Sequence, residues 1–224
     1  GYLQAVRSLA DKHAAVLIFD EVVTGFRLAI GGAQEHYGVT PDLAALGKGM
    51  ANGMPLSAVV GRAEIMRLAD EGAFVSLTFG GEALSLAAGL ATIDELRKRD
   101  VSRHAAMLGS RLYEGAKALI REHKMDDVAY VSGTKVMPAL FFRACGEVSA
   151  NDVLALFQQE VIDRGVLFLG VNYFCASHTD ADVGVALDAY AQGFARLDDL
   201  KRGAPIRSLL RGETYRPIFK RNKH

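Results

Sequence analysis

An aspartate and a lysine that each follow an apolar stretch are the residues best placed to do chemistry in this 224-residue sequence. Asp20 ends the run "VLIFD", and Lys48 stands between two glycines in "LGKGM". Such apolar runs are typical of buried strands in α/β sheets, which bind ligands beyond their carboxyl ends. The two residues are 28 positions apart (48 − 20), which fits two successive strands. We therefore expect Asp20 and Lys48 to reach the same crevice.

An acid and an amine in one crevice suit a particular cofactor, pyridoxal 5'-phosphate. A lysine amine can form a Schiff base with its aldehyde, and a carboxylate can keep its pyridine nitrogen protonated, so that the ring acts as an electron sink. The inference of a pyridoxal phosphate site rests on the acid and the lysine together. Each residue alone is weaker evidence, because acids at strand ends also bind magnesium, cap helices or face solvent, and most lysines are simply solvated.

Three longer stretches resemble the class III aminotransferases, which are pyridoxal phosphate enzymes of fold type I. They are "IFDEVVTGFR", "YGVTPDLAALGKGMANGMPLSAVVG" and "TFGGEALSLAAGLATIDEL". Their order and spacing are similar to the family's through about residue 100, and "SHTDADV" continues the likeness more loosely. The motifs "TGFR", "GGAQ" and "LGK" are most similar to the glutamate-1-semialdehyde 2,1-aminomutase branch of that family.

The resemblance implies roles for four residues. Asp20 would pair with the pyridine nitrogen, Lys48 would carry the cofactor covalently and move a proton, and Val22 would pack against the ring. Thr78 would bind the cofactor phosphate across a subunit interface, so the resemblance also implies a homodimer with shared sites. Val22 is equally compatible with core packing, and Thr78 with a helix cap. Glu21 is expected to make an internal salt bridge without touching the cofactor.

The sequence departs from the family where members commonly have Gly-Asn-Pro, because Glu82 stands in the place of the asparagine. A glutamate suits the N-terminus of the helix expected there, although its charge would disfavour a phosphate nearby. His178 is a second ambiguous residue. It could act as a base, but the pattern favours a capping box formed by Thr179 and Asp182.

Helix and strand patterns alternate in the βαβ manner over the first hundred residues. They predict the C-terminal part of a pyridoxal phosphate-binding large domain over 1–100, with an α/β fold and a mostly parallel sheet. The expected elements are a helix at 2–13, strands at 15–19, 42–47 and 56–61, a helix at 62–70 and a long helix from Glu82.

A smaller α+β C-terminal domain is expected over 101–224. Its expected elements are a helix at 104–123, strands at 128–133 and 136–144 around a turn at Gly133-Thr134, a helix at 150–164, strands at 166–170 and 173–177, and a helix at 179–199. The helix from Glu82 has a small-residue face suited to close helix packing, and the two domains would be joined through a long helix.

Composition narrows the class of partner. The 26 basic and 26 acidic side chains give no electrostatic reason to expect nucleic acid or an anionic membrane surface. Two cysteines cannot form a disulfide framework, and no Cys/His spacing resembles a zinc site.

No apolar run reaches the roughly 18 residues of a membrane helix, and the start lacks the order of a signal peptide, so we expect a cytoplasmic protein.

The predicted function is transamination, the transfer of an amino group between an amine or amino acid and a carbonyl compound. The first residue is Gly1, inside an amphipathic helix pattern, so we expect the sequence to lack the family's N-terminal half. The aminomutase is the alternative within the class, and a non-catalytic remnant or dimerising subunit is the alternative outside it. A nucleotide-binding domain is disfavoured, because no GxxxxGK[ST] follows a strand.

Overall fold

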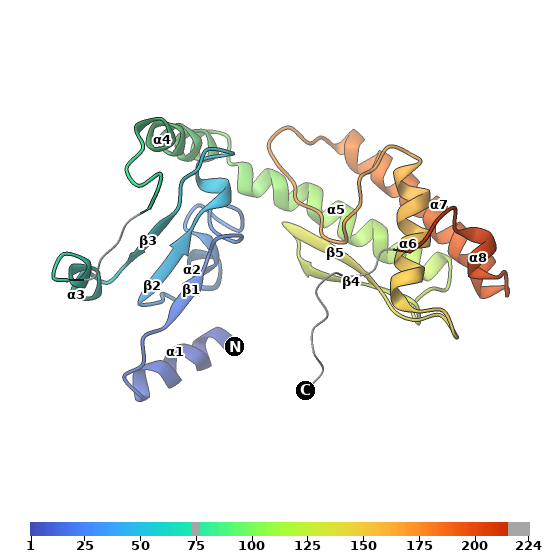
Figure 1. Ribbon diagram of the computed structural model, residues 1–224, viewed down its shortest axis with the longest axis horizontal. Helices are drawn as coiled ribbons and strands as arrows, with labels where there is room; N and C mark the ends of the chain where they lie inside the picture. The colour runs from blue at the N-terminus through green and yellow to red at the C-terminus, as the bar shows by residue number, and fades with distance from the viewer. Residues whose placement is uncertain (73–76, 215–224) are drawn as a thin grey trace. The chain divides into compact units, whose positions relative to one another are not determined.

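The structure is a computed structural model that describes residues 1–72 and 77–214 (Figure 1). The chain divides into two compact units, Gly1–His104 and Ala105–His224. Each unit contains its own sheet and its own helices, and each is described separately below.

The first unit is built on a three-stranded sheet in the order β1-β2-β3. β1 (Ile18–Asp20) and β2 (Leu43–Leu46) are parallel, whereas β2 and β3 (Ala58–Gly61) are antiparallel. The three predicted strands are therefore confirmed within a few residues. The sheet is mixed over the described residues, where the sequence predicted a mostly parallel one.

Helices and short helical turns surround this sheet (Figure 1). They are α1 (Tyr2–Lys12), α2 (Gly32–Tyr37), the 3-10 turn η1 (Lys48–Met50), α3 (Ala63–Met66), the 3-10 turn η2 (Arg67–Ala69) and α4 (Ala83–Lys98). Helix α2 was not predicted, because its six residues lie in a glycine-rich stretch that reads as a loop.

A buried aspartate holds the amino ends of β1 and β2 together. Asp42 is 5% exposed, and its carboxylate accepts the N–H of Leu17 at 2.7 Å. It also pairs with Arg7 of α1 at 2.9 Å and with Arg62, which follows β3, at 3.0 Å. These contacts, led by the Leu17 N–H, hold the pKa of Asp42 well below its usual range. One side chain thus ties α1, β1 and the end of β3 to β2.

The second unit contains an antiparallel hairpin of β4 (Ala129–Thr134) and β5 (Met137–Phe142). Thr134 pairs with Met137, so the turn lies at 135–136, and the predicted turn at Gly133-Thr134 is wrong. Gly133 has a φ of +84°, and a Cβ there would lie 2.5 Å from the Met137 carbonyl oxygen. The glycine is needed for this close approach between strands rather than for the turn itself.

Over the described residues, four helices belong to the second unit: α5 (Val101–Glu122), whose first turn lies in the first unit, α6 (Ala150–Ile162), α7 (Asp180–Lys201) and α8 (Ile206–Leu209). Three of them confirm predicted helices, and the four-residue α8 was not predicted. In the described parts of the chain, no helix combines the length and apolar character that crossing a membrane requires.

An aromatic cluster forms the core of the second unit. The Phe157 ring lies 5.3 Å from Phe168, 5.4 Å from Tyr190 and 5.2 Å from Phe194, measured between ring centroids. All four side chains are at most 1% exposed. Burial of this much aromatic surface stabilises the second unit.

The strands predicted at 166–170 and 173–177 are wrong. This segment is irregular and meets the hairpin through a single bridge between Ala139 and Val171. Its apolar residues suggested a buried strand, yet Leu167 is 79% exposed. Apolar sequence alone does not distinguish a strand from an extended loop that has no partner strand along its length.

We predict that Gly193→Ala destabilises the second unit. A Cβ at Gly193 of α7 would lie 2.6 Å from the Phe157 ring, and overpacking a core costs roughly 1–3 kcal/mol. Gly184→Ala in the same helix is the matched control, because no atom lies within 4 Å of its added Cβ. That variant should gain about 0.8–1 kcal/mol of helix stability. Urea unfolding curves measure both, and shifts of the same sign would contradict the packing argument.

We also predict that Asp42→Asn lowers the unfolding temperature at neutral pH by roughly 5 °C. The pKa of Asp42 is lower in the folded chain than in the unfolded one, so its stabilisation is present above the unfolded value of about 3.9. It is lost progressively as the pH falls below that value towards the lower folded pKa, so the difference between wild type and variant should shrink steadily below about pH 4. Asp11→Asn, which removes the exposed partner of Arg7, should change little. A constant difference across pH would refute the assignment.

Candidate active site

The first unit brings Asp20 and Lys48 to the same edge of the sheet. In the parallel register, Asp20 lies beside Ala45, and β2 ends one residue later at Leu46. Lys48 then opens η1 directly beyond that end. Because the carboxyl ends of parallel strands share an edge, both side chains belong to one region, as the sequence predicted.

Asp20 keeps most of its hydrogen-bonding capacity. It is exposed, and its Oδ1 accepts the N–H of Val22 at 3.0 Å. Over the described residues, its carboxylate makes no ion pair. β1 ends at Asp20, so Val22 lies in the turn that follows the strand. The carboxylate can therefore serve a bound group.

Lys48 combines an exposed side chain with an unusual backbone. Its φ is +42°, in the left-handed region that L-residues rarely adopt, and Phe26 and Asn52 in neighbouring loops share this property. Within residues 1–72 and 77–214, the Lys48 amine has no hydrogen bond or ion pair. Left-handed non-glycine residues cost about 1–3 kcal/mol each. Ala14, Asp100 and Lys124 adopt the same backbone region elsewhere in the chain, so the case for Lys48 rests on its place at the sheet edge.

Val22 lies beside the residue that precedes Lys48. A Cβ added to Gly47 would be 3.7 Å from Cγ1 of Val22 and 3.8 Å from Cβ of Ser57. Val22 is half-buried, so part of its side chain remains accessible. Both of its expected roles, packing in the core and forming an apolar surface next to the lysine, fit this position.

Helix α4 supports the turn that carries Lys48. A Cβ added to Gly89 of α4 would lie 2.7 Å from Cδ2 of Leu56 and 3.8 Å from the Met50 carbonyl oxygen. Met50 is the last residue of η1. The small side of α4 thus lets the helix approach η1 closely, as its small-residue pattern suggested.

Glu21, the neighbour of Asp20, has a structural role that the sequence did not predict. It is 1% exposed, and its carboxylate accepts the N–H groups of Ala33 at 2.8 Å and Gln34 at 3.0 Å. The Thr24 hydroxyl donates a third hydrogen bond. The expected salt bridge is wrong, since no cation pairs with Glu21 in the described chain. Glu21 instead binds the first turn of α2. The pair Gly31-Gly32 is the sequence feature that could have indicated this contact.

Glu82 caps the N-terminus of helix α4, and Thr78 lies before this cap. Glu82 is its N-cap, and the carboxylate accepts the N–H groups of Leu84 at 2.7 Å and Ser85 at 2.8 Å, as well as the Ser85 hydroxyl at 2.6 Å. These bonds, led by the Ser85 hydroxyl, lower the pKa of Glu82. Thr78 lies exposed in a turn before the cap. The helix-start interpretation of Glu82 is confirmed, and the alternative that Thr78 caps this helix is wrong.

His178 belongs to the second unit, at the start of α7. Thr179 donates to Asp182 through its N–H at 2.7 Å and its hydroxyl at 2.8 Å, which confirms the predicted capping box. In the part of the chain that the structure describes, no group of three or more His, Cys, Asp and Glu residues is arranged to hold a metal ion.

Several solved structures share this fold. One, described as a transaminase with PLP bound, superposes with a TM-score of 0.80 at 23% identity, over 90% of this chain and 49% of that one. The FumI protein of Sphingopyxis sp. MTA144, solved in its PLP internal aldimine form, gives 0.78 at 28% identity, over 93% and 50%. An omega-transaminase from Sphaerobacter thermophilus gives 0.74 at 26% identity, over 87% and 47%.

Curated relatives carry a different name within the same family. Glutamate-1-semialdehyde 2,1-aminomutases of Methanococcoides burtonii and Laribacter hongkongensis are 37% and 38% identical, over 85% and 88% of this chain. The alignments cover 47% and 49% of those relatives, so the chain spans about half the length of the curated relatives it matches.

The sequence profile described as Aminotransferase class-III matches residues 1–174, which include Asp20, Val22, Lys48 and Thr78. This match covers well over half of the chain and agrees with the motifs from which the resemblance was first drawn. The chain belongs to the class-III aminotransferase family.

Proposed function

We propose that this chain is part of a pyridoxal 5'-phosphate-dependent transaminase, which moves an amino group between an amine or amino acid and a carbonyl compound. The observation that carries the proposal is the parallel register of β1 and β2. That register supports a shared site, because it sets Asp20 and Lys48 at one carboxyl edge of the sheet. Solved relatives at 28% and 26% identity are described as a PLP form and as an omega-transaminase.

The residues at this edge fit the cofactor chemically. Once bound, pyridoxal phosphate supplies an electron sink for cleavage at the substrate's α-carbon. Lys48 would attach it through Nζ and, after displacement by the substrate amine, hold and return the proton at that atom. Asp20 would keep the pyridine nitrogen protonated through an ion pair. Val22 would press on the ring face beside Gly47.

We assign residues 1–100 to the C-terminal part of the cofactor-binding large domain and 101–224 to the small C-terminal domain. The assignment is supported by the two compact units, which meet at His104 and Ala105. All four proposed site residues lie in the first of them. The rest of a complete site would come from sequence that the curated relatives have and this chain does not span.

The aminomutase is a second candidate, favoured by the names and the 37–38% identity of the curated relatives. It would use the same lysine and aspartate to move nitrogen between adjacent carbons of one substrate. Glutamate 1-semialdehyde consumed without any added carbonyl acceptor would identify this reaction, whereas a requirement for an acceptor would identify transamination.

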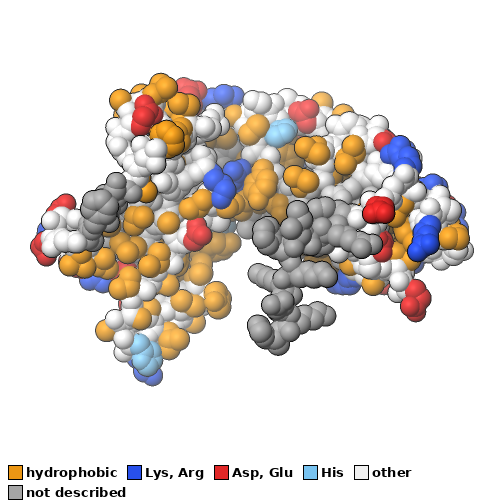
Figure 2. Space-filling model, viewed as in Figure 1, with side chains coloured by type: hydrophobic (Ala, Val, Ile, Leu, Met, Phe, Trp, Pro, Cys, Tyr) orange, Lys and Arg blue, Asp and Glu red, His pale blue; other side chains and the backbone are white. Residues whose placement is uncertain are grey.

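We also propose a homodimer in which Thr78 binds the cofactor phosphate of the partner subunit. An apolar surface around Thr78 supports association. Its exposed side chains are Leu77 (64%), Phe79 (56%), Leu84 (63%), Leu86 (46%) and Leu90 (71%). Figure 2 shows hydrophobic side chains over the region of α4. Large apolar side chains exposed over one short segment support an interaction site there.

The central test is reductive trapping. Borohydride treatment of the protein with pyridoxal phosphate should leave a stable pyridoxyl group on Lys48, located by peptide mass spectrometry, and Lys48→Ala should abolish it. Lys98→Ala, at an exposed lysine of α4, is the matched control and should label like wild type. Asp20→Asn should retain trapping but weaken cofactor binding by about tenfold or more, because it removes a charge-assisted contact. Labelling spread over many lysines would refute the proposed site.

The dimer has a separate test. Leu90→Lys puts a charge on the α4 face that also carries Leu86, and it should weaken dimerisation at least about tenfold in sedimentation velocity. Leu68→Lys changes a leucine that is 57% exposed outside the 77–90 surface, and it should leave the dimer intact. Equal effects of both variants, or a monomeric wild type, would contradict an interface at α4.

A further inference from the structure

The turn that follows Lys48 places an asparagine directly before a glycine. The Ala51 carbonyl accepts the Met54 N–H at 3.1 Å, which closes a four-residue turn with Asn52 and Gly53 at its centre. Their φ angles are +47° and +104°, so both central residues are left-handed, as in a type I′ turn. Such turns favour Asn-Gly, because asparagine tolerates the left-handed region and glycine has no Cβ to clash. The backbone of the turn thus accounts for this pair of residues.

The two central residues of the turn have no contacts that would restrain them. Asn52 is exposed, and over residues 1–72 and 77–214 neither its side-chain amide nor the Gly53 N–H makes a hydrogen bond. No atom lies within 4 Å of a Cβ built on Gly53, so the space around the turn is open. The Asn52 side chain can therefore rotate onto the Gly53 nitrogen without displacing a neighbour.

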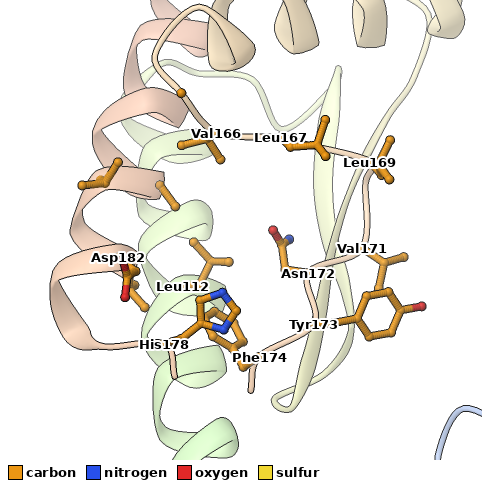
Figure 3. A pocket seen from close by; sticks show the side chains of 14 residues that line it. Leu112, Val166, Leu167, Leu169, Val171, Asn172, Tyr173, Phe174, His178 and Asp182 are labelled. Carbon is orange, nitrogen blue, oxygen red and sulfur yellow. The ribbon is translucent and has the colours of Figure 1, made fainter. Parts of the chain in front are cut away.

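The structure restrains the other two asparagines that it describes. Asn172 donates through Nδ2 to the Pro138 carbonyl at 3.1 Å and accepts the Tyr190 hydroxyl at 2.9 Å. It lines a cavity of about 450 Å³ in the second unit (Figure 3), so its amide is held in place by these contacts although the cavity opens beside it. Asn151 lies in α6, where the N–H of the residue after it donates to the Ser149 carbonyl at 3.0 Å.

We propose that Asn52 is a site of spontaneous deamidation. The Gly53 nitrogen bonds to Cγ of Asn52, and the side-chain amide leaves as ammonia together with the proton of that nitrogen. The product is a five-membered succinimide ring. Water then opens the ring at Cγ to give aspartate, or at the main-chain carbonyl carbon to give isoaspartate. The sum is the loss of one ammonia and the gain of one water, so neither an oxidant nor a reductant is involved.

Both products change the segment that joins η1 to β3. Aspartate puts a carboxylate on it, four positions beyond Lys48 (52 − 48). Isoaspartate carries the main chain through Cβ and Cγ of residue 52, which lengthens the backbone inside a turn closed by a hydrogen bond. The deamidation itself is independent of cofactor chemistry, whereas its bearing on Lys48 as the cofactor-binding lysine rests on the proposed function.

The test compares the folded protein with the unfolded chain. The 224-residue protein is kept at mildly alkaline pH in water labelled with heavy oxygen, folded in one sample and unfolded by urea in another. Peptide mass spectrometry counts the labelled acid formed at each asparagine, and electron-transfer fragmentation distinguishes isoaspartate from aspartate. We expect folding to slow Asn52 by no more than about threefold, and Asn151 and Asn172 by at least about tenfold, which are barrier changes of about 0.7 and 1.4 kcal/mol.

Asn52→Gly is the matched variant, because glycine also adopts a positive φ and preserves the turn. It should remove the labelled product from this peptide and leave the rates at Asn151 and Asn172 unchanged. Folding that slows Asn52 as much as the other two asparagines would overturn the proposal. Aspartate formed without isoaspartate would also overturn it, because the amide would then be hydrolysed without a ring. These readouts need no pyridoxal phosphate, so failure of the proposed function would not affect them.

Discussion

The first unit depends on the buried carboxylate of Asp42, which fixes β1 against β2. Its side chain binds the Leu17 N–H, while its backbone N–H donates to the Leu17 carbonyl at 2.8 Å. Strand pairing slips in whole residues, and a slip of one residue would send every side chain to the opposite face. The clamp at the amino ends therefore determines which residues emerge at the carboxyl ends. The parallel orientation of β1 and β2 places Asp20 and Lys48 at one edge, and the Asp42 contacts fix the register in which the two strands reach it.

Sequence patterns predicted the long elements and the shared sheet edge well, because periodicity and apolar runs report burial directly. They failed where a tertiary partner decides the structure. The segment 166–170 reads as a strand but finds no strand to pair with, and α2 forms because Glu21 binds its first N–H groups. The left-handed backbone of Lys48 has no sequence signal either, since lysine is not a residue that favours it. Nothing in the sequence around Asp42 indicates that its carboxylate binds the Leu17 N–H.

Backbone N–H groups, rather than cations, satisfy the acids near the candidate site. Glu21 binds the start of α2, and Glu82 binds the start of α4. Carboxylates placed this way stabilise helix N-termini through hydrogen bonds and the helix dipole. They are also unavailable to neutralise a nearby amine. This division of roles leaves Lys48 without an ion pair in the described chain, and it leaves Asp20 as the acid at the edge that can still bind a new partner.

The two units differ in how fully they bury their own apolar surface. The second closes around Phe157 and its aromatic neighbours, whereas the first exposes 59% of Ile18, 57% of Val59 and 71% of Leu90. A sheet and helix that leave such residues in solvent gain little from burial and are suited to further association. The candidate active site lies in this less self-sufficient unit. We infer that the arrangement of the site residues depends on what packs against those exposed faces. The first unit should also be the part of the chain whose stability responds most to association.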